Sequence, residues 1–154
     1  MAQAELKLQQ LGIELPEAPK ARFSYIPVCQ TGNLLYLSGQ DCRINGELMY
    51  KGKVGAELTV EMGNQAARQT MINCLAVIKD YLGDLDRVSK VVKLLGFVNS
   101  APGFAEQPLV INGASDLLIE VYGEKGRHAR SAVSANELPF HTPVEIEMIV
   151  EIKD

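Results

Sequence analysis

The sequence predicts an α+β fold in which two helices pack on one face of a mixed sheet. Apolar residues between Thr59 and Leu82 recur at steps of three and four, which is a helical period, whereas those of 144–152 alternate, which is a strand period. Along the chain the order is strands, a long helix, a strand, a second helix and two strands. With 154 residues, 47% of them hydrophobic, the chain can bury one core. We therefore expect a single domain over 1–154.

The N-terminal third predicts a short helix followed by strands. Leucines precede Gly12, which is typical of a helix that ends at a glycine. Three prolines then keep the chain extended. Strands are predicted over 26–30 and 33–41, joined at Thr31-Gly32, because Gly32 and Asn33 can both take positive φ. A second turn at 44–47 leads to a short strand near 47–50.

The middle of the chain carries the longest predicted helix. Thr59 is a plausible N-cap and Gly83 a plausible end, and ten small or apolar residues form one face between them. Residues 87–100 are rich in β-branched and apolar side chains, as in a central strand. A second helical period runs over 105–122, although Asn112-Gly113 weakens its middle and has no evident packing role.

Two final strands complete the sheet, one in ARSAVSANELP and one in PVEIEMIVEI. The last alternates strictly but carries an apolar residue, Ile149, on its polar side. Two helices can cover only one face of the sheet. We therefore expect partner subunits to bury the other face.

Charge and composition exclude several classes of protein. The net charge is −4, with 15 Lys and Arg scattered along the chain, which argues against nucleic acid as a partner. No apolar run approaches the roughly 20 residues of a membrane span. The start has no signal-peptide core, and we expect a cytoplasmic protein. Neither the cysteines nor the histidines have metal-ligand spacing, and there is no nucleotide fingerprint, so no metal and no cofactor is predicted.

Arg130 is the first candidate for chemistry. It opens a predicted strand, and its guanidinium offers paired donors that match a carboxylate and keeps its charge on burial. At a sheet end it would be a ready carboxylate anchor. The alternative is a structural ion pair with Glu145 or Glu147, within the chain or between subunits, which is the more common arrangement for such residues.

Glu145 is the second candidate. It shares one side of the last strand with Glu147 and Glu151, which by default is a solvated face. Because it follows Pro143-Val144, it could instead point into a cleft beside Arg130, where a carboxylate can hold and polarise a water. The spacing alone leaves both possibilities open.

Tyr25 and Gly39 are weaker candidates. Tyr25 lies in the proline-flanked segment and could cover a pocket or just the core. Gly39 marks either a bulge or a close approach of the backbone.

Several segments together resemble the Rid family, also called YjgF or L-PSP endoribonuclease-like proteins. They are SGQ at 38–40, the helix at 64–83, VING at 110–113, and above all ARSAVSANELP followed by VEIEMIVEI. The match runs from about residue 24 to residue 153. The first 22 residues look like the N-terminal extension of a longer subgroup.

The resemblance implies a chorismate mutase-like fold and a homotrimer with a central barrel and three clefts between subunits. It implies that Arg130 anchors the carboxylate of a 2-imino or enamine acid, and that Glu145 positions the water that releases ammonia and a 2-keto acid. Tyr25, Gly39 and Asn112 then line the cleft. The resemblance therefore favours a functional role for Arg130 over the ion pair.

Two departures from the family pattern bear on the activity. Where active deaminases commonly carry a cysteine, two residues after the arginine, this chain has Ala132. Arg127 and His128 add a cation and an imidazole that the deaminases generally lack, and we count them as candidate binding residues for a more anionic ligand or a different reaction. The alternative to imine hydrolysis is a regulatory trimer that binds a small carboxylate without chemistry. Ribonuclease activity rests only on the family's label.

Overall fold

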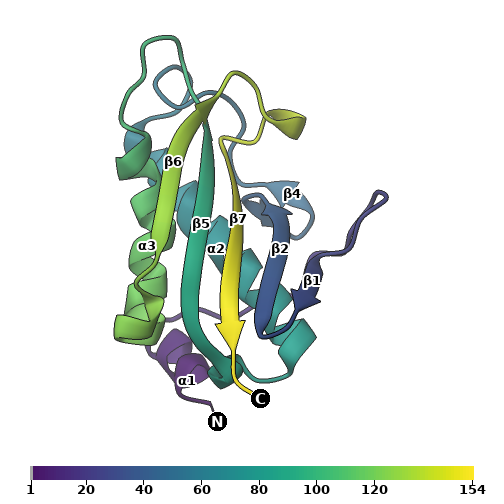
Figure 1. Cartoon of the computed structure of the whole chain (residues 1–154). Coiled ribbons are helices and arrows are strands. Elements are labelled where there is room, and N and C mark those ends of the chain that lie inside the picture. The colour runs from purple at the N-terminus through teal and green to yellow at the C-terminus, as the bar shows by residue number, and fades with distance from the viewer. Residues whose placement is uncertain (1) are drawn as a thin grey trace.

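The computed structural model describes residues 2–154 and has one five-stranded mixed sheet with helices on one face (Figure 1). The strand order is β1-β2-β7-β5-β6, and only β5 and β6 are parallel neighbours. The predicted α+β class is confirmed. The helices and strands are α1 Gln3–Gln10, β1 Val28–Thr31, β2 Leu34–Gln40, β3 Arg43–Ile44, β4 Glu47–Leu48, α2 Val60–Leu82, β5 Val88–Asn99, α3 Gln107–Tyr122, β6 Ala129–Ala135 and β7 Val144–Ile152.

Glycine-containing turns join the first four strands in pairs. Between β1 and β2, Gly32 has a φ of 56°, whereas Asn33 is not among the positive-φ residues. Between β3 and β4, Asn45 and Gly46 have φ values of 53° and 84°. Positive φ at both central residues suits a tight hairpin turn. The predicted turns are present, but only the second uses two left-handed residues.

The ends of α2 lie where the sequence predicts them. Thr59 precedes the helix in an extended conformation, and its side chain accepts a hydrogen bond from the Met62 amide at 3.1 Å. After the helix, Gly83 is left-handed with a φ of 79°, and its amide donates to Lys79 O at 2.8 Å. Both arrangements satisfy backbone groups that a helix end leaves unpaired.

Gly113 lies where α3 crosses α2. A Cβ at this position would be 2.0 Å from the backbone oxygen of Asn64 in α2. The Asn64 side chain also donates to Leu109 O in α3 at 2.9 Å. The apparent lack of a packing role for Asn112-Gly113 was therefore wrong for Gly113. A glycine in the middle of this helix permits two backbones to touch.

Replacement of Gly113 by alanine should destabilise the protein by about 3 kcal/mol, because a backbone atom cannot turn aside as a flexible side chain does. Urea unfolding at fixed protein concentration measures the change in the free energy of unfolding. Asp116→Ala is the control, an exposed change in the same helix, with an expected effect within about 0.5 kcal/mol. A loss below about 1 kcal/mol for the Gly113 variant would show that the helices separate at little cost.

The two faces of the sheet differ in burial. Along β7, the residues at 144, 146, 148, 150 and 152 are buried and those between them are partly buried or exposed. The buried set packs against α2, and α3 covers β5 and β6 on the same side, which we call the helix face. The opposite side, the open face, carries large exposed side chains such as Tyr36 of β2 and Val133 of β6. The predicted alternation of the last strand is confirmed.

The N-terminal helix is part of the same core. Ala4 and Leu8 of α1 are buried in the main hydrophobic cluster. Asp86 accepts hydrogen bonds from the amides of Gln3 and Ala4 at 2.7 and 2.9 Å, which holds the start of the helix. None of the helices in residues 2–154 has both the length and the apolar character needed to cross a membrane.

Candidate functional site

Arg130 lies on β6 with its guanidinium against α3. Nη1–H donates to Ser115 Oγ at 3.0 Å, and Nη2–H donates to Pro108 O at 3.2 Å. Among residues 2–154 no acidic oxygen lies within 4.0 Å of it, so the ion pair with Glu145 or Glu147 is not formed within one chain. The ion pair between subunits stays a prediction. An arginine has five N–H donors. Its remaining donors are therefore available to a carboxylate.

Two further side chains are linked to Arg130 by hydrogen bonds, and with it we call them the arginine cluster: Ser115 and His128. Asn112 and Ser115 stand four and seven residues after Pro108 on α3, which places them on one face of that helix. The assignment of Asn112 to the site stays a prediction. His128 comes from the segment that leads into β6, and its Nε2 is 2.9 Å from Ser115 Oγ. Positions far apart in the sequence thus meet at one edge of the sheet.

Arg127 does not join the arginine cluster. Its Nε–H donates to Glu124 Oε1 at 3.0 Å, and its side chain is 63% exposed. An exposed ion pair of this kind contributes little to stability. Within one chain the guanidinium of Arg127 therefore pairs with the carboxylate of Glu124. The assignment of Arg127 as a binding residue stays a prediction.

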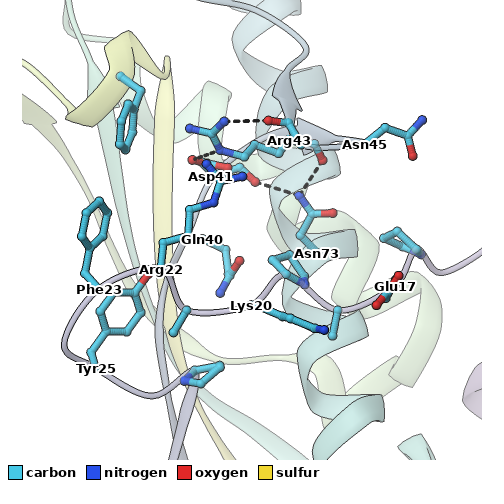
Figure 2. Close-up of a pocket in the computed structure, with 18 residues that line it drawn as sticks. Glu17, Lys20, Arg22, Phe23, Tyr25, Gln40, Asp41, Arg43, Asn45 and Asn73 are labelled. Carbon is cyan, nitrogen blue, oxygen red and sulfur yellow. Dashed lines mark hydrogen bonds and ion pairs between the residues drawn. The ribbon is translucent and has the colours of Figure 1, made fainter.

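Tyr25 and Gly39 line a pocket of about 470 Å³ on the other side of the molecule (Figure 2). The extended segment 16–27 forms one wall, and residues from the end of β2 to the β3–β4 turn form the other. Arg43 braces the second wall: its Nε–H donates to Asp41 at 3.1 Å, and its guanidinium lies 5.1 Å from the ring of Phe140. We call this the tyrosine pocket.

Glu145 lies directly behind Gly39. A Cβ on Gly39 would be 2.8 Å from Glu145 Oε1, so only a glycine leaves the carboxylate in its place. Burial, and to a lesser degree the negative charges of Asp41 and Glu147, raise the pKa of Glu145. For Gly39 the sequence left open a bulge or a close approach of the backbone. The structure supports the close approach, in which the backbone at Gly39 lies against the carboxylate of Glu145. A half-buried carboxylate with a raised pKa is the kind of group that accepts a proton from water.

Arg130 and Glu145 lie on opposite faces of the sheet. Arg130 is the register partner of Leu94, which is fully buried on the helix face. Glu145 is the partner of Phe97, three residues further along β5 and on the open face. Register partners project to the same side of a sheet, and alternate residues to opposite sides. The expectation that Glu145 points into a cleft beside Arg130 is therefore wrong within one chain.

Glu145→Gln should stabilise the protein near pH 8. Because the folded chain raises the pKa of this carboxyl, its ionised form costs folding free energy at high pH. The cost fades as the pH falls through the raised pKa and is absent below the ordinary value of 4.5. Thermal unfolding at fixed protein concentration should thus give a higher Tm for the variant at about pH 8 and no gain at about pH 4. Exposed Glu137→Gln serves as control, and a gain that persists in acid would contradict the explanation.

Ser115 is the site residue that sequence reasoning missed. It is a buried polar residue, 7% exposed, on a face of α3 that otherwise packs into the core. A single serine in an apolar helical pattern resembles an ordinary core position. The only signal was the neighbouring Asn112, which marks the same face one turn earlier.

Comparison with known proteins gives the family. A model of the family described as "YjgF/chorismate_mutase-like, putative endoribonuclease" matches residues 5–152. The chain belongs to the YjgF (Rid) family. Its chorismate mutase-like fold follows from this membership and from the sheet and helices above.

Three proteins illustrate the range of YjgF family relatives. Protein TCP17 of Trypanosoma cruzi is 45% identical over 148 residues, which is 96% of this chain and 92% of that protein. The 2-iminobutanoate/2-iminopropanoate deaminase of Dermatophagoides farinae is 31% identical over 142 residues, 92% of this chain and 95% of that protein. The crystal structure of Atu1372 from Agrobacterium tumefaciens superposes with a TM-score of 0.90 at 46% identity, covering 97% of this chain and 92% of that one.

Proposed function

We propose that the protein hydrolyses 2-imino or enamine acids to 2-keto acids and ammonia, at sites that two copies of the chain form together. The observation that carries the proposal is the division of the chemistry between the two faces of the sheet. An acid-free guanidinium lies on the helix face, and a half-buried carboxyl lies on the open face. The helix-face half has a carboxylate anchor but no general base, and the open-face half has a general base but no anchor. The deaminase among the relatives supports the reaction type.

The roles follow from the chemistry of the two groups. Arg130 of one copy would hold the substrate carboxylate through its unused N–H donors. Glu145 of a second copy would accept a proton from water as the water oxygen bonds to the imine carbon. Glu145 would return this proton to the nitrogen as the C=N double bond becomes single, which gives a carbinolamine. The hydroxyl proton of the carbinolamine would then pass through Glu145 to the amino group, the carbon–nitrogen bond would break, and ammonia would leave with the 2-keto acid as the other product. Tyr25 and Gly39 would wall the half of the site that contains Glu145.

A homotrimer is the assembly that we propose for these sites. Supporting it are the family membership and the open face, where Tyr36 and Val133 are 43% and 41% exposed. A sheet face that helices leave open and that carries large exposed side chains is often covered by a partner subunit. Three copies in a ring give three equivalent sites between neighbours.

A direct assay tests the reaction. An amino-acid oxidase or a dehydratase generates 2-iminobutyrate or 2-aminoacrylate in solution, and the appearance of the keto acid is followed with and without the protein. We expect the protein to speed this step. No acceleration across imines from several different amino acids would overturn the proposal.

Ala132 gives a specific reason to keep the alternative of binding without chemistry. It lies two residues after Arg130 on the same face of β6 and packs against the core. A thiol at this position is common in the active deaminases and is absent here. Hydrolysis by an oriented water needs no thiol nucleophile. Stabilisation of the protein by keto acids with no turnover of any imine would favour the binding role.

A further inference from the structure

The buried hydroxyl of Ser115 joins Arg130 to His128. Ser115 Oγ is 3.0 Å from Arg130 Nη1 and 2.9 Å from His128 Nε2. The other ring nitrogen of His128, Nδ1, is 2.6 Å from Gly126 O. Neither Ser115 nor His128 makes any other side-chain hydrogen bond among residues 2–154. The three side chains and one carbonyl form a continuous chain.

The two ends of this hydrogen-bonded series fix the direction of its outer hydrogen bonds. Arginine can only donate, so Ser115 Oγ accepts from Nη1–H. The Gly126 carbonyl can only accept, so His128 Nδ1 carries a proton and donates to it. When the imidazole carries its single proton on Nδ1, Nε2 is an acceptor, and the Ser115 hydroxyl can donate to it. His128 therefore serves Ser115 with one nitrogen and the backbone with the other.

This series of hydrogen bonds determines where the guanidinium of Arg130 points. The Ser115 hydroxyl restrains Nη1 from within the protein, and Pro108 O restrains Nη2. Ser115 is 7% exposed, so bulk water has little access to its hydroxyl as a substitute partner. Without the His128 acceptor the buried hydroxyl proton of Ser115 would lose its partner, and the hydroxyl would hold Nη1 less firmly.

We propose that Ser115 and His128 are positioning residues that hold Arg130 in the orientation that receives the ligand carboxylate. The inference rests on the proposed function, because it assumes that Arg130 is the carboxylate anchor. It gives His128 a role through Ser115 instead of direct contact with a ligand. Neither residue is part of the reacting groups.

Binding and turnover separate this role from a purely structural one. Ser115→Ala should raise KM, and the Kd for a 2-keto acid such as 2-oxobutanoate, by about 10-fold while kcat stays within about twofold, because an anchor contributes uniform binding. His128→Phe keeps an aromatic ring but removes the acceptor and should raise KM by about fivefold. His128→Gln places a carbonyl oxygen near the position of Nε2 and should stay within about twofold of the wild type.

A double-mutant cycle tests whether the effect passes through Arg130. In an Arg130→Lys background the group that Ser115 holds is gone, so adding Ser115→Ala should change Kd by less than about twofold. Thr70→Val is the matched control. It removes another buried hydroxyl from a helix, one that donates only to Ala66 O at 2.8 Å, and it should leave Kd and KM unchanged.

The possible outcomes distinguish this inference from the proposed function. Unchanged KM and Kd in Ser115→Ala, an effect of equal size in the Arg130→Lys background, or a His128→Gln variant as impaired as His128→Phe would each overturn the positioning role, with imine hydrolysis intact. Arg130-dependent binding of keto acids without any turnover would overturn the hydrolysis, and the Kd series would still test the positioning role. No Arg130-dependent binding at all would overturn both.

Discussion

Arg130→Ala should lower kcat/KM for imine hydrolysis by about 100-fold or more. A bidentate contact between a guanidinium and a carboxylate consists of two charge-assisted hydrogen bonds, each contributing about 1.5–3 kcal/mol. Their loss amounts to about 3 kcal/mol or more, and each 1.4 kcal/mol corresponds to a factor of about ten. The expected reduction is large because no other cation in the arginine cluster can replace Arg130. Steady-state kinetics with a freshly generated imine measures it.

The control is Arg68→Ala. Arg68 is an arginine of α2 whose guanidinium pairs with Glu120 at 3.3 Å, away from both proposed halves of the site. Its removal deletes the same side chain and charge and should leave kcat/KM within about twofold. Equal losses in the two variants would point to a general effect of charge, and full activity in Arg130→Ala would remove the anchor from the mechanism.

Two inactive variants should restore activity when they assemble together. Glu145→Gln is expected to lower kcat by about 100-fold or more, since general-base catalysis contributes about that factor. Arg130→Ala loses kcat/KM for a different reason, because it no longer binds the substrate carboxylate. Since the two side chains face opposite sides of one sheet, a shared site takes Arg130 from one copy and Glu145 from another. A mixed assembly therefore contains some sites that are complete.

The amount of activity regained can be calculated. In a random equimolar mixture, a site is complete when the arginine comes from the Glu145→Gln chain and the glutamate from the Arg130→Ala chain. This gives about one quarter of the wild-type sites. The variants are coexpressed, or unfolded and refolded together, and assayed beside each variant alone.

A mixture of Arg130→Ala with the double variant Arg130→Ala/Glu145→Gln is the control for this experiment. It contains no intact arginine and should stay inactive. Separate assemblies that never exchange chains would also regain nothing, so differently tagged chains must first be shown to copurify. Copurified mixtures without regained activity would contradict a site shared between copies.

Local signals in the sequence predicted the elements well. Thr59 and Gly83 mark the ends of α2 through caps that depend only on neighbouring residues. The strict alternation of the last strand predicts which of its residues are buried. Such features need no knowledge of the rest of the chain, and for this reason they could be read in advance.

Features that depend on contacts between distant segments could not be predicted in the same way. Gly113 weakens a helix in isolation, and its value appears only where α3 meets Asn64 of α2. The face on which Arg130 lies depends on its register with Leu94, which the sequence of β6 alone does not give. Ser115 looks like a core position until the guanidinium is placed against it. The sequence was thus a better guide to which residues belong to the candidate site than to how they lie relative to one another.

The placement of the guanidinium and the carboxyl on opposite faces of a thin sheet has a kinetic consequence. In the proposed shared site a lone folded chain holds only half of each reaction centre, so dilution that separates the copies should abolish turnover while every helix and strand persists. Specific activity would then depend on protein concentration, falling at concentrations below the dissociation constant of the assembly. The amount of the protein in a cell would set the rate per molecule as well as the number of molecules.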